Sequence, residues 1–115
     1  MKNKIEMNKK YCMHNSEVVA LAYLPENEVL MVKEPDGNLF FVLDDFVVVG
    51  NKITTKNTVS FTVTENEITN CINSYLSTNN ITTATNDIIV TAIRNTYYKI
   101  PTQIAEVVAE WFMRQ

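Results

Sequence analysis

The sequence has 115 residues, the size of a single domain with one hydrophobic core. With 46% apolar and 20% charged residues, the composition is that of a folded globular protein and excludes an intrinsically disordered chain. The only two glycines, Gly37 and Gly50, are too few for glycine-rich phosphate-binding loops, and the net charge of −3 disfavours phosphate backbones.

The charge is unevenly distributed. Residues 1–10 hold four lysines and one glutamate, a net charge of 4 − 1 = +3, so the rest of the chain is near −3 − 3 = −6. We expect residues 1–15 to form a basic, flexible N-terminal segment. Between residues 17 and 50, seven carboxylates accompany one lysine, which favours a cationic partner.

Residues 17–64 are predicted to form strands. Apolar runs of strand length span 18–24, 29–32, 39–43 and 46–49, and turn residues such as Pro35-Asp36-Gly37 separate them. Apolar and polar residues then alternate over 59–64, as in a strand with one exposed face. The pattern predicts an antiparallel meander of about four to five strands.

The period changes to that of helices after Thr64, which with Glu67 forms a capping box. Apolar residues from Ile68 to Leu76 repeat at helical spacing. A second helix is predicted over 86–98, with Thr85 as its N-cap, and a third after Pro101-Thr102. The prediction is therefore a single α+β domain, residues 1–115, in which three C-terminal helices (65–115) pack on the strands.

Catalytic and metal-binding patterns are missing from the sequence. The one histidine, His14, has no base or nucleophile at a diagnostic spacing, and Cys12, His14 and Cys71 do not complete a zinc ligand set. We expect no enzyme activity and no cofactor. Two cysteines are too few for a disulfide framework, and no signal peptide or membrane-spanning run is recognisable, so we predict a cytoplasmic protein.

One part of the sequence resembles a known family. The runs 29–32 and 41–42, together with Asp36-Gly37 and Asp45, are similar to the two-strand opening of the BRO-type N-terminal domain of phage antirepressors. That family continues into an apolar helix ending in Leu-Gly, whereas residues 46–49 predict a strand here. The likeness is also what any hairpin with an Asp-Gly turn would show, and the chain is not assigned to the family.

A nucleic-acid-binding regulator is an alternative function. The helices contain one local cluster of suitable residues, at the end of the second predicted helix: Arg94, Asn95, Tyr98 and Lys99. Carboxylates outnumber cations over 65–115, so we do not expect useful affinity for duplex DNA. A small enzyme with an unrecognised site is the third hypothesis for the function.

The first function that we predict is binding to another protein. A small acidic module of the phage anti-defence or immunity-protein type would inhibit or regulate that protein by occupying its surface. Homo-oligomerisation is left open. The predicted partner-binding residues are the carboxylates at three predicted turns, which would face a basic site: Glu26, Glu28, Glu34, Asp36, Asp44 and Asp45.

Overall fold

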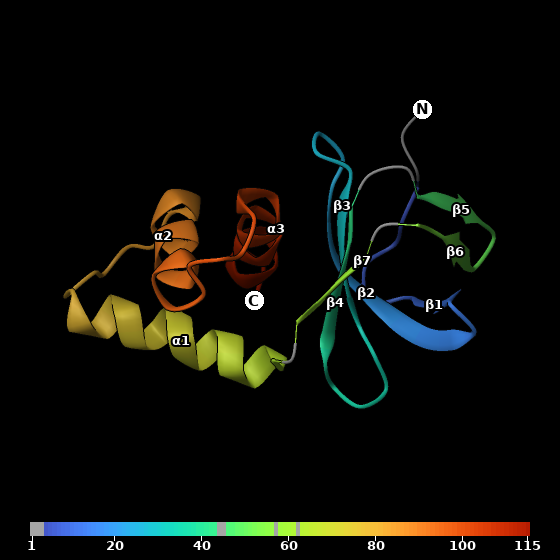
Figure 1. The fold of residues 1–115 in the computed structure, drawn as a ribbon. Coiled ribbons are helices and arrows are strands. Elements are labelled where there is room, and N and C mark those ends of the chain that lie inside the picture. Colours follow the sequence, from blue (N-terminus) through green and yellow to red (C-terminus); the bar gives the residue numbers. More distant parts are fainter. Residues whose placement is uncertain (1–3, 44–45, 57, 62) are drawn as a thin grey trace.

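The computed structural model describes residues 4–43, 46–56, 58–61 and 63–115. Seven strands precede three helices (Figure 1). The strands are β1 (Lys10–Met13), β2 (Ser16–Leu24), β3 (Val29–Lys33), β4 (Leu39–Leu43), β5 (Val47–Val49), β6 (Lys52–Thr54) and β7 (Thr58–Phe61). The helices are α1 (Glu65–Thr78), α2 (Asn86–Thr96) and α3 (Thr102–Met113).

All seven strands belong to one sheet in the order β5-β6-β1-β2-β3-β4-β7. Every pair is antiparallel except β1 and β6, which run parallel. The helices form a layer on one side of the twisted sheet (Figure 1). The α+β class and the three C-terminal helices are thus confirmed, but the sheet has more strands than the four to five predicted.

The strands that were not predicted are β1 and β6. Strand β1 lies within the segment expected to be flexible, where Tyr11 and Met13 are buried and pair with the start of β2. Strand β6 is three residues long, and only Ile53 in it is buried. Strands this short contain too few residues to show the alternation of apolar and polar side chains by which a strand is recognised. They form because a partner strand from elsewhere in the chain supplies hydrogen bonds.

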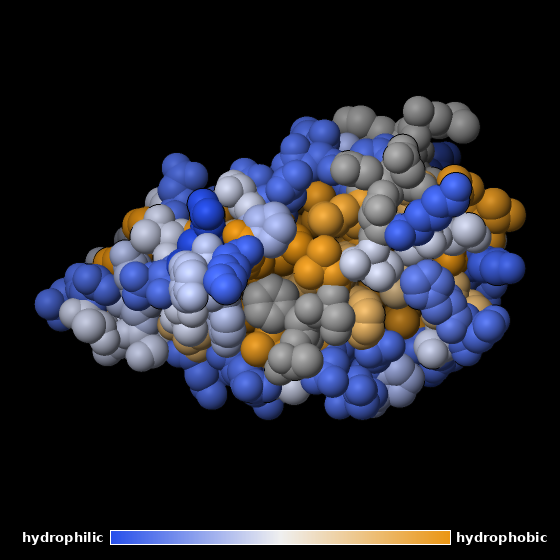
Figure 2. Space-filling view, viewed as in Figure 1, coloured by the Kyte–Doolittle hydropathy of each residue, from blue (hydrophilic) through white to orange (hydrophobic). Residues whose placement is uncertain are grey.

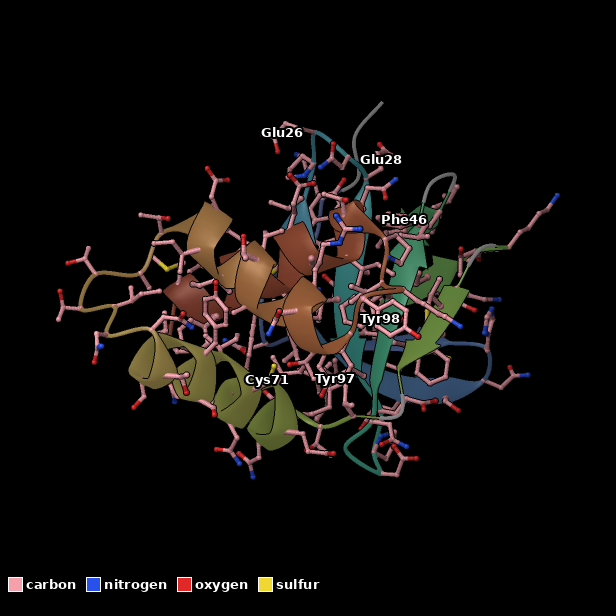
Figure 3. All side chains as sticks on the ribbon, turned by 60° about the vertical axis from the view of Figure 1, so that its left-hand side comes forward. Glu26, Glu28, Phe46, Cys71, Tyr97 and Tyr98 are labelled. Carbon is pink, nitrogen blue, oxygen red and sulfur yellow. The ribbon has the colours of Figure 1, made fainter. Side chains whose placement is uncertain are left out.

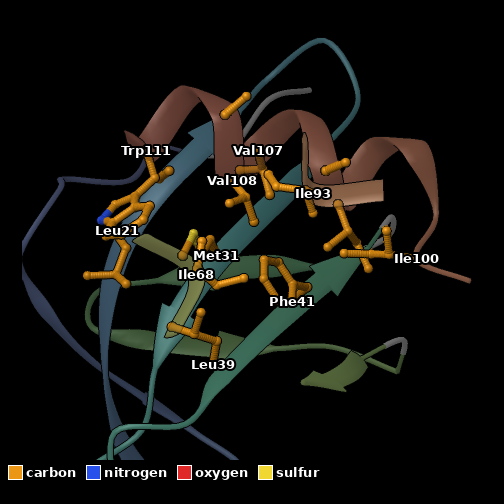
Figure 4. Close-up of a cluster of buried hydrophobic side chains, with 14 of the residues drawn as sticks. Leu21, Met31, Leu39, Phe41, Ile68, Ile93, Ile100, Val107, Val108 and Trp111 are labelled. Atoms are coloured by element: carbon orange, nitrogen blue, oxygen red, sulfur yellow. The ribbon is translucent and has the colours of Figure 1, made fainter. Parts of the chain in front are cut away.

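The sheet is buried on both faces. Along β3, Met31 points into a cluster shared with the helices, whereas Leu30 and Val32 point into a second cluster on the other face. The β5–β6 hairpin covers that second cluster through Ile53 and the partly buried Val48. The helix side of the core is drawn in Figure 4, where side chains of the sheet meet those of all three helices.

The helices begin where the sequence predicts. The Thr64 hydroxyl accepts from the backbone N–H of Glu67, whose carboxylate accepts from the N–H of Thr64, so the capping box is confirmed. Thr85 caps α2 in the same way through the N–H of Ile88. Helix α3 packs on β2 and β3. Its buried residues are Ile104, Ala105, Val107, Val108, Ala109 and Trp111.

The C-terminal end of α3 is tied to a β-bulge. The register between β2 and β3 shifts between Ala20 and Ala22, so Leu21 is the extra residue. Its carbonyl accepts a hydrogen bond from the Arg114 guanidinium at 2.9 Å, and Arg114 Nε also lies 3.6 Å from a Glu110 oxygen. Arg114 therefore links the end of α3 to the backbone of β2 at the bulge.

Candidate functional site

The predicted acidic residues divide between two ends of the sheet. Glu26 and Glu28 lie in the β2–β3 turn, and Glu34 and Asp36 lie in the β3–β4 turn. Consecutive hairpins reverse direction at opposite ends, as Figure 1 shows for these two turns. The remaining predicted pair, Asp44 and Asp45, lies outside the described residues.

The β2–β3 turn gathers more negative charge than the sequence predicts. The Asn27 side-chain amide donates to a Glu106 carboxylate oxygen at 3.3 Å, which brings α3 beside the turn. Figure 3 shows Glu26 and Glu28 at this end of the molecule. The left-handed backbone of Glu28, with φ 48°, tightens the turn, and its N–H donates to the Pro25 carbonyl at 3.3 Å. We call Glu26, Glu28 and Glu106 the acidic end.

The carboxylates of the acidic end lie apart from the cations that the structure describes. Within the described ranges, no lysine or arginine nitrogen lies within 4 Å of their oxygens. Other carboxylates of the chain are paired, and the pairs are Glu6 with Lys9, Glu17 with Lys10, Glu65 with Lys33, and Glu110 with Arg114. Among the described residues, the negative charge of the acidic end is therefore not neutralised by a lysine or arginine side chain.

The opposite turn is electrostatically different. Burial, followed by repulsion from Asp36, raises the pKa of the Glu34 carboxyl above its ordinary value. The Asp36 carboxylate accepts a hydrogen bond from the backbone N–H of Asn38 at 3.0 Å, and this bond stabilises the turn. This turn also has a cation beside it, since Lys33 directly precedes Glu34. The Lys33 ammonium pairs with the Glu65 carboxylate at 2.8 Å.

The polar residues that could support catalysis do not assemble. His14 is an exposed residue of the β1–β2 turn, and its Nε2 lies 3.5 Å from the Thr55 carbonyl oxygen. Cys12 and Cys71 are free thiols. Among the residues that the structure describes, no group of three His, Cys, Asp or Glu side chains could hold a metal ion.

A hollow of about 510 Å³ lies between α1 and α2. Cys71 forms part of its wall and donates to the Thr96 hydroxyl at 3.2 Å. The other lining residues are uncharged and polar apart from Tyr75. Nearby, burial raises the pKa of Tyr97, with smaller contributions from Cys71 and Glu67. The hollow offers no charge that would select a ligand.

The surface of the helical layer is mostly hydrophilic, as Figure 2 shows over α1 and α2. Hydrophobic residues show between the helices and the sheet in the same view. Four large hydrophobic residues are exposed in the described part of the chain, and they are Val47, Val49, Tyr98 and Met113. Of these, Tyr98 is the only aromatic residue.

The structure brings two of the predicted nucleic-acid residues, Tyr98 and Lys99, into contact, whereas Asn95 lines the hollow between α1 and α2. Arg94 and Asn95 are exposed in the last turn of α2, and Tyr98 and Lys99 follow in the connection to α3. The Lys99 ammonium lies 5.8 Å from the centre of the Tyr98 ring. No helix of the described chain has the length and apolar character needed to cross a bilayer.

No protein-family model, curated protein or solved structure matches this chain. Its function therefore has to be inferred from its own surface.

Proposed function

We propose that this protein is a non-catalytic, acidic binding module that inhibits or regulates another protein by covering a basic surface on it. The observation that carries the proposal is the acidic end, where the Asn27 contact brings Glu106 beside the turn of Glu26 and Glu28 and none of the three has a cation among the described residues within 4 Å. Small inhibitors of the phage anti-defence and immunity-protein type have this character as a class.

The physical argument rests on how the charges are held. Glu26 and Glu28 lie on a turn between two strands whose central residues are fully buried, so a rigid scaffold presents them. Glu26, Glu28 and Glu106 have no described lysine or arginine within 4 Å, so a cationic partner can pair with them. Complementary charge chiefly raises the association rate and suppresses wrong partners, which suits an inhibitor that must find one target quickly.

The opposite turn supports the proposal less well. Lys33 and Glu65 form an ion pair near Glu34 and Asp36, so the local field there is partly compensated. We therefore assign partner binding to the acidic end and use the other turn as the matched control.

The experiment is a comparison of two charge reversals. Immobilised wild-type protein, Glu26→Lys/Glu28→Lys and Glu34→Lys/Asp36→Lys are exposed to a lysate of the organism that encodes the chain, and bound proteins are identified by mass spectrometry. We expect a protein that the wild type and the Glu34/Asp36 variant retain and that the Glu26/Glu28 variant loses.

The captured protein is then purified and its association rate is measured against salt. The Glu26/Glu28 variant should associate more slowly at low salt, and its difference from wild type should shrink as salt screens the charges. Equal capture and equal rates for all three folded proteins would refute binding through the acidic end.

The cellular compartment is also part of the proposal. We infer a cytoplasmic location, which the two free thiols support because a reducing compartment preserves them.

A further inference from the structure

A tight turn holds the α2–α3 connection. The backbone N–H of Ile100 donates to the Tyr97 carbonyl at 3.0 Å, which closes a β-turn with Tyr98 and Lys99 as its two central residues. Ile100 is buried in the helix-side core, and Tyr97 packs against it. The ends of the turn are therefore anchored in the protein interior.

The two central residues point away from that interior. Tyr98 is 72% exposed, the same exposure as the most exposed valine of the sheet. Figure 3 shows Tyr97 beside Cys71, whereas the Tyr98 ring lies away from Cys71 and in front of the strands in this view. The anchored turn restricts the backbone of Tyr98, so a ligand that stacks on its ring orders little additional structure.

One cation contacts the ring, and a second precedes it in the chain. Lys99 follows Tyr98 in the turn, with its ammonium 5.8 Å from the ring centre, and Arg94 precedes Tyr98 by four residues. Both side chains are exposed. In the part of the chain that the structure describes, no carboxylate oxygen lies within 4 Å of either cation. Their charge is thus available to an anionic ligand.

We propose that this turn, with Tyr98, Lys99 and the neighbouring Arg94, is a second binding surface that takes a short segment of single-stranded nucleic acid. The Tyr98 ring stacks on one base, and the two cations contact the phosphates on either side. The surface is separate from the acidic end and does not depend on the protein-binding proposal.

A single strand fits these observations better than a duplex or an acidic protein. Bases in a duplex are stacked on each other and offer no free face to one ring, and two cations are too few for strong phosphate neutralisation. An acidic protein surface would use the cations but would leave the exposed ring face without a planar partner. A single strand supplies the planar face and the anions at adjacent positions.

The surface also predicts weak affinity. The carbonyl end of α2 carries partial negative charge, which opposes a phosphate near Arg94. With only two phosphate contacts, the logarithm of the binding constant should fall with the logarithm of salt at a slope of about 1.4. Stacking on Tyr98 must therefore supply most of the selectivity.

The test uses the full chain and fluorescence anisotropy with three labelled probes, namely oligothymidylate, polyphosphate and polyglutamate. We expect oligothymidylate to bind best. Tyr98→Ala should weaken its binding about tenfold, and Tyr98→Trp should retain it because the stacking surface is kept. Lys99→Gln or Arg94→Gln should each lower the salt slope by about 0.7. Lys52→Gln, which removes an exposed lysine of β6, is the matched control. It should change neither the affinity for oligothymidylate nor the salt slope.

Three results would overturn the inference. The first is equal binding of polyphosphate and oligothymidylate, or no effect of Tyr98→Ala, which would mean attraction by charge alone. The second is polyglutamate binding that requires Tyr98, which would identify an acidic protein as the partner. The third is no binding of oligothymidylate at low salt. Melting curves of every variant verify the fold. Glu26→Gln/Glu28→Gln, which adds no new lysine, should leave the effect of Tyr98→Ala on oligothymidylate binding unchanged if this surface is distinct from the acidic end.

Discussion

Replacing Trp111 by alanine should destabilise the protein severely. Trp111 is the only tryptophan, is 4% exposed, and lies in the helix-side core cluster with Leu21 and Met31. Removing a buried tryptophan side chain costs about 3 to 5 kcal/mol, since the lost hydrophobic contacts and the remaining cavity both contribute. A domain of this size has a total stability of about 5 to 15 kcal/mol, so the loss is a large fraction of it.

The expected change in melting temperature follows from the chain length. An unfolding entropy of about 2.1 cal/mol/K per residue amounts to about 0.24 kcal/mol/K for 115 residues. A loss of about 3 to 5 kcal/mol therefore lowers the melting temperature by about 12 to 20 °C. Thermal unfolding followed by circular dichroism measures this shift. Met113→Ala is the matched control, because Met113 lies on the same helix but is 45% exposed, and its shift should be a few degrees at most.

The tryptophan also reports on its own burial. Fluorescence of the wild type should be blue-shifted and poorly quenched by acrylamide, because α3 covers the indole against β2. If Trp111→Ala melts within a few degrees of wild type and the wild-type indole is freely quenched, α3 is not docked as described. A normal melt accompanied by a change in sedimentation coefficient would assign the same face to an interface between copies.

Three further substitutions test the local structure. Thr64→Ala removes the side-chain cap of α1 and should cost about 1 kcal/mol in urea unfolding. Arg114→Ala removes the guanidinium that donates to the Leu21 carbonyl at the bulge. Because that guanidinium is half-exposed to solvent, the loss of unfolding free energy should be only about 1 kcal/mol, again measured by urea unfolding. Burial raises the pKa of Glu34, so the folded state binds its proton more tightly than the unfolded state, and stability decreases as pH rises through and above the ordinary value of 4.5. Glu34→Gln should therefore raise the urea midpoint at about pH 7 and leave it unchanged at about pH 3.

The helices could be predicted because their signals are local. The capping box of α1 lies within four residues, and the buried positions of α2 and α3 repeat within each helix. Observed helix starts at Glu65, Asn86 and Thr102 match the predicted ones. The end of α2 at Thr96 falls two residues before the predicted end, as is common where the last turn becomes irregular.

The missing strands depend on distant partners. Strand β6 contains one buried residue, Ile53, and pairs in parallel with β1, which is about 40 residues earlier in the chain. Neither strand carries enough alternation to be recognised alone. The seven-stranded sheet therefore follows from pairing across the chain, which local sequence patterns do not contain.

The composition of the acidic end could not be predicted from local sequence patterns either. The sequence identifies the carboxylates and the turns, but it treats them as one group. In the structure, the direction of the hairpins sends Glu34 and Asp36 to the far end, and the Asn27 contact adds Glu106 from a helix. A residue 79 positions away joins the site through one hydrogen bond, and no local pattern predicts that.

Tyr98 is the opposite case, because its exposure follows from the sequence. Ile89, Ile93 and Tyr97 are spaced by four residues, so one helical face carries all three into the core, as predicted and observed. In the predicted helix over 86–98, the next residue along the chain is rotated by about 100° from that face, which predicts that Tyr98 is exposed. The structure ends α2 at Thr96 and places the exposed Tyr98 in the turn that follows. What the sequence does not contain is the hydrogen bond from Ile100 to Tyr97 that closes the turn. That hydrogen bond restrains the backbone of the exposed Tyr98. A base can therefore stack on the Tyr98 ring with little further loss of backbone entropy.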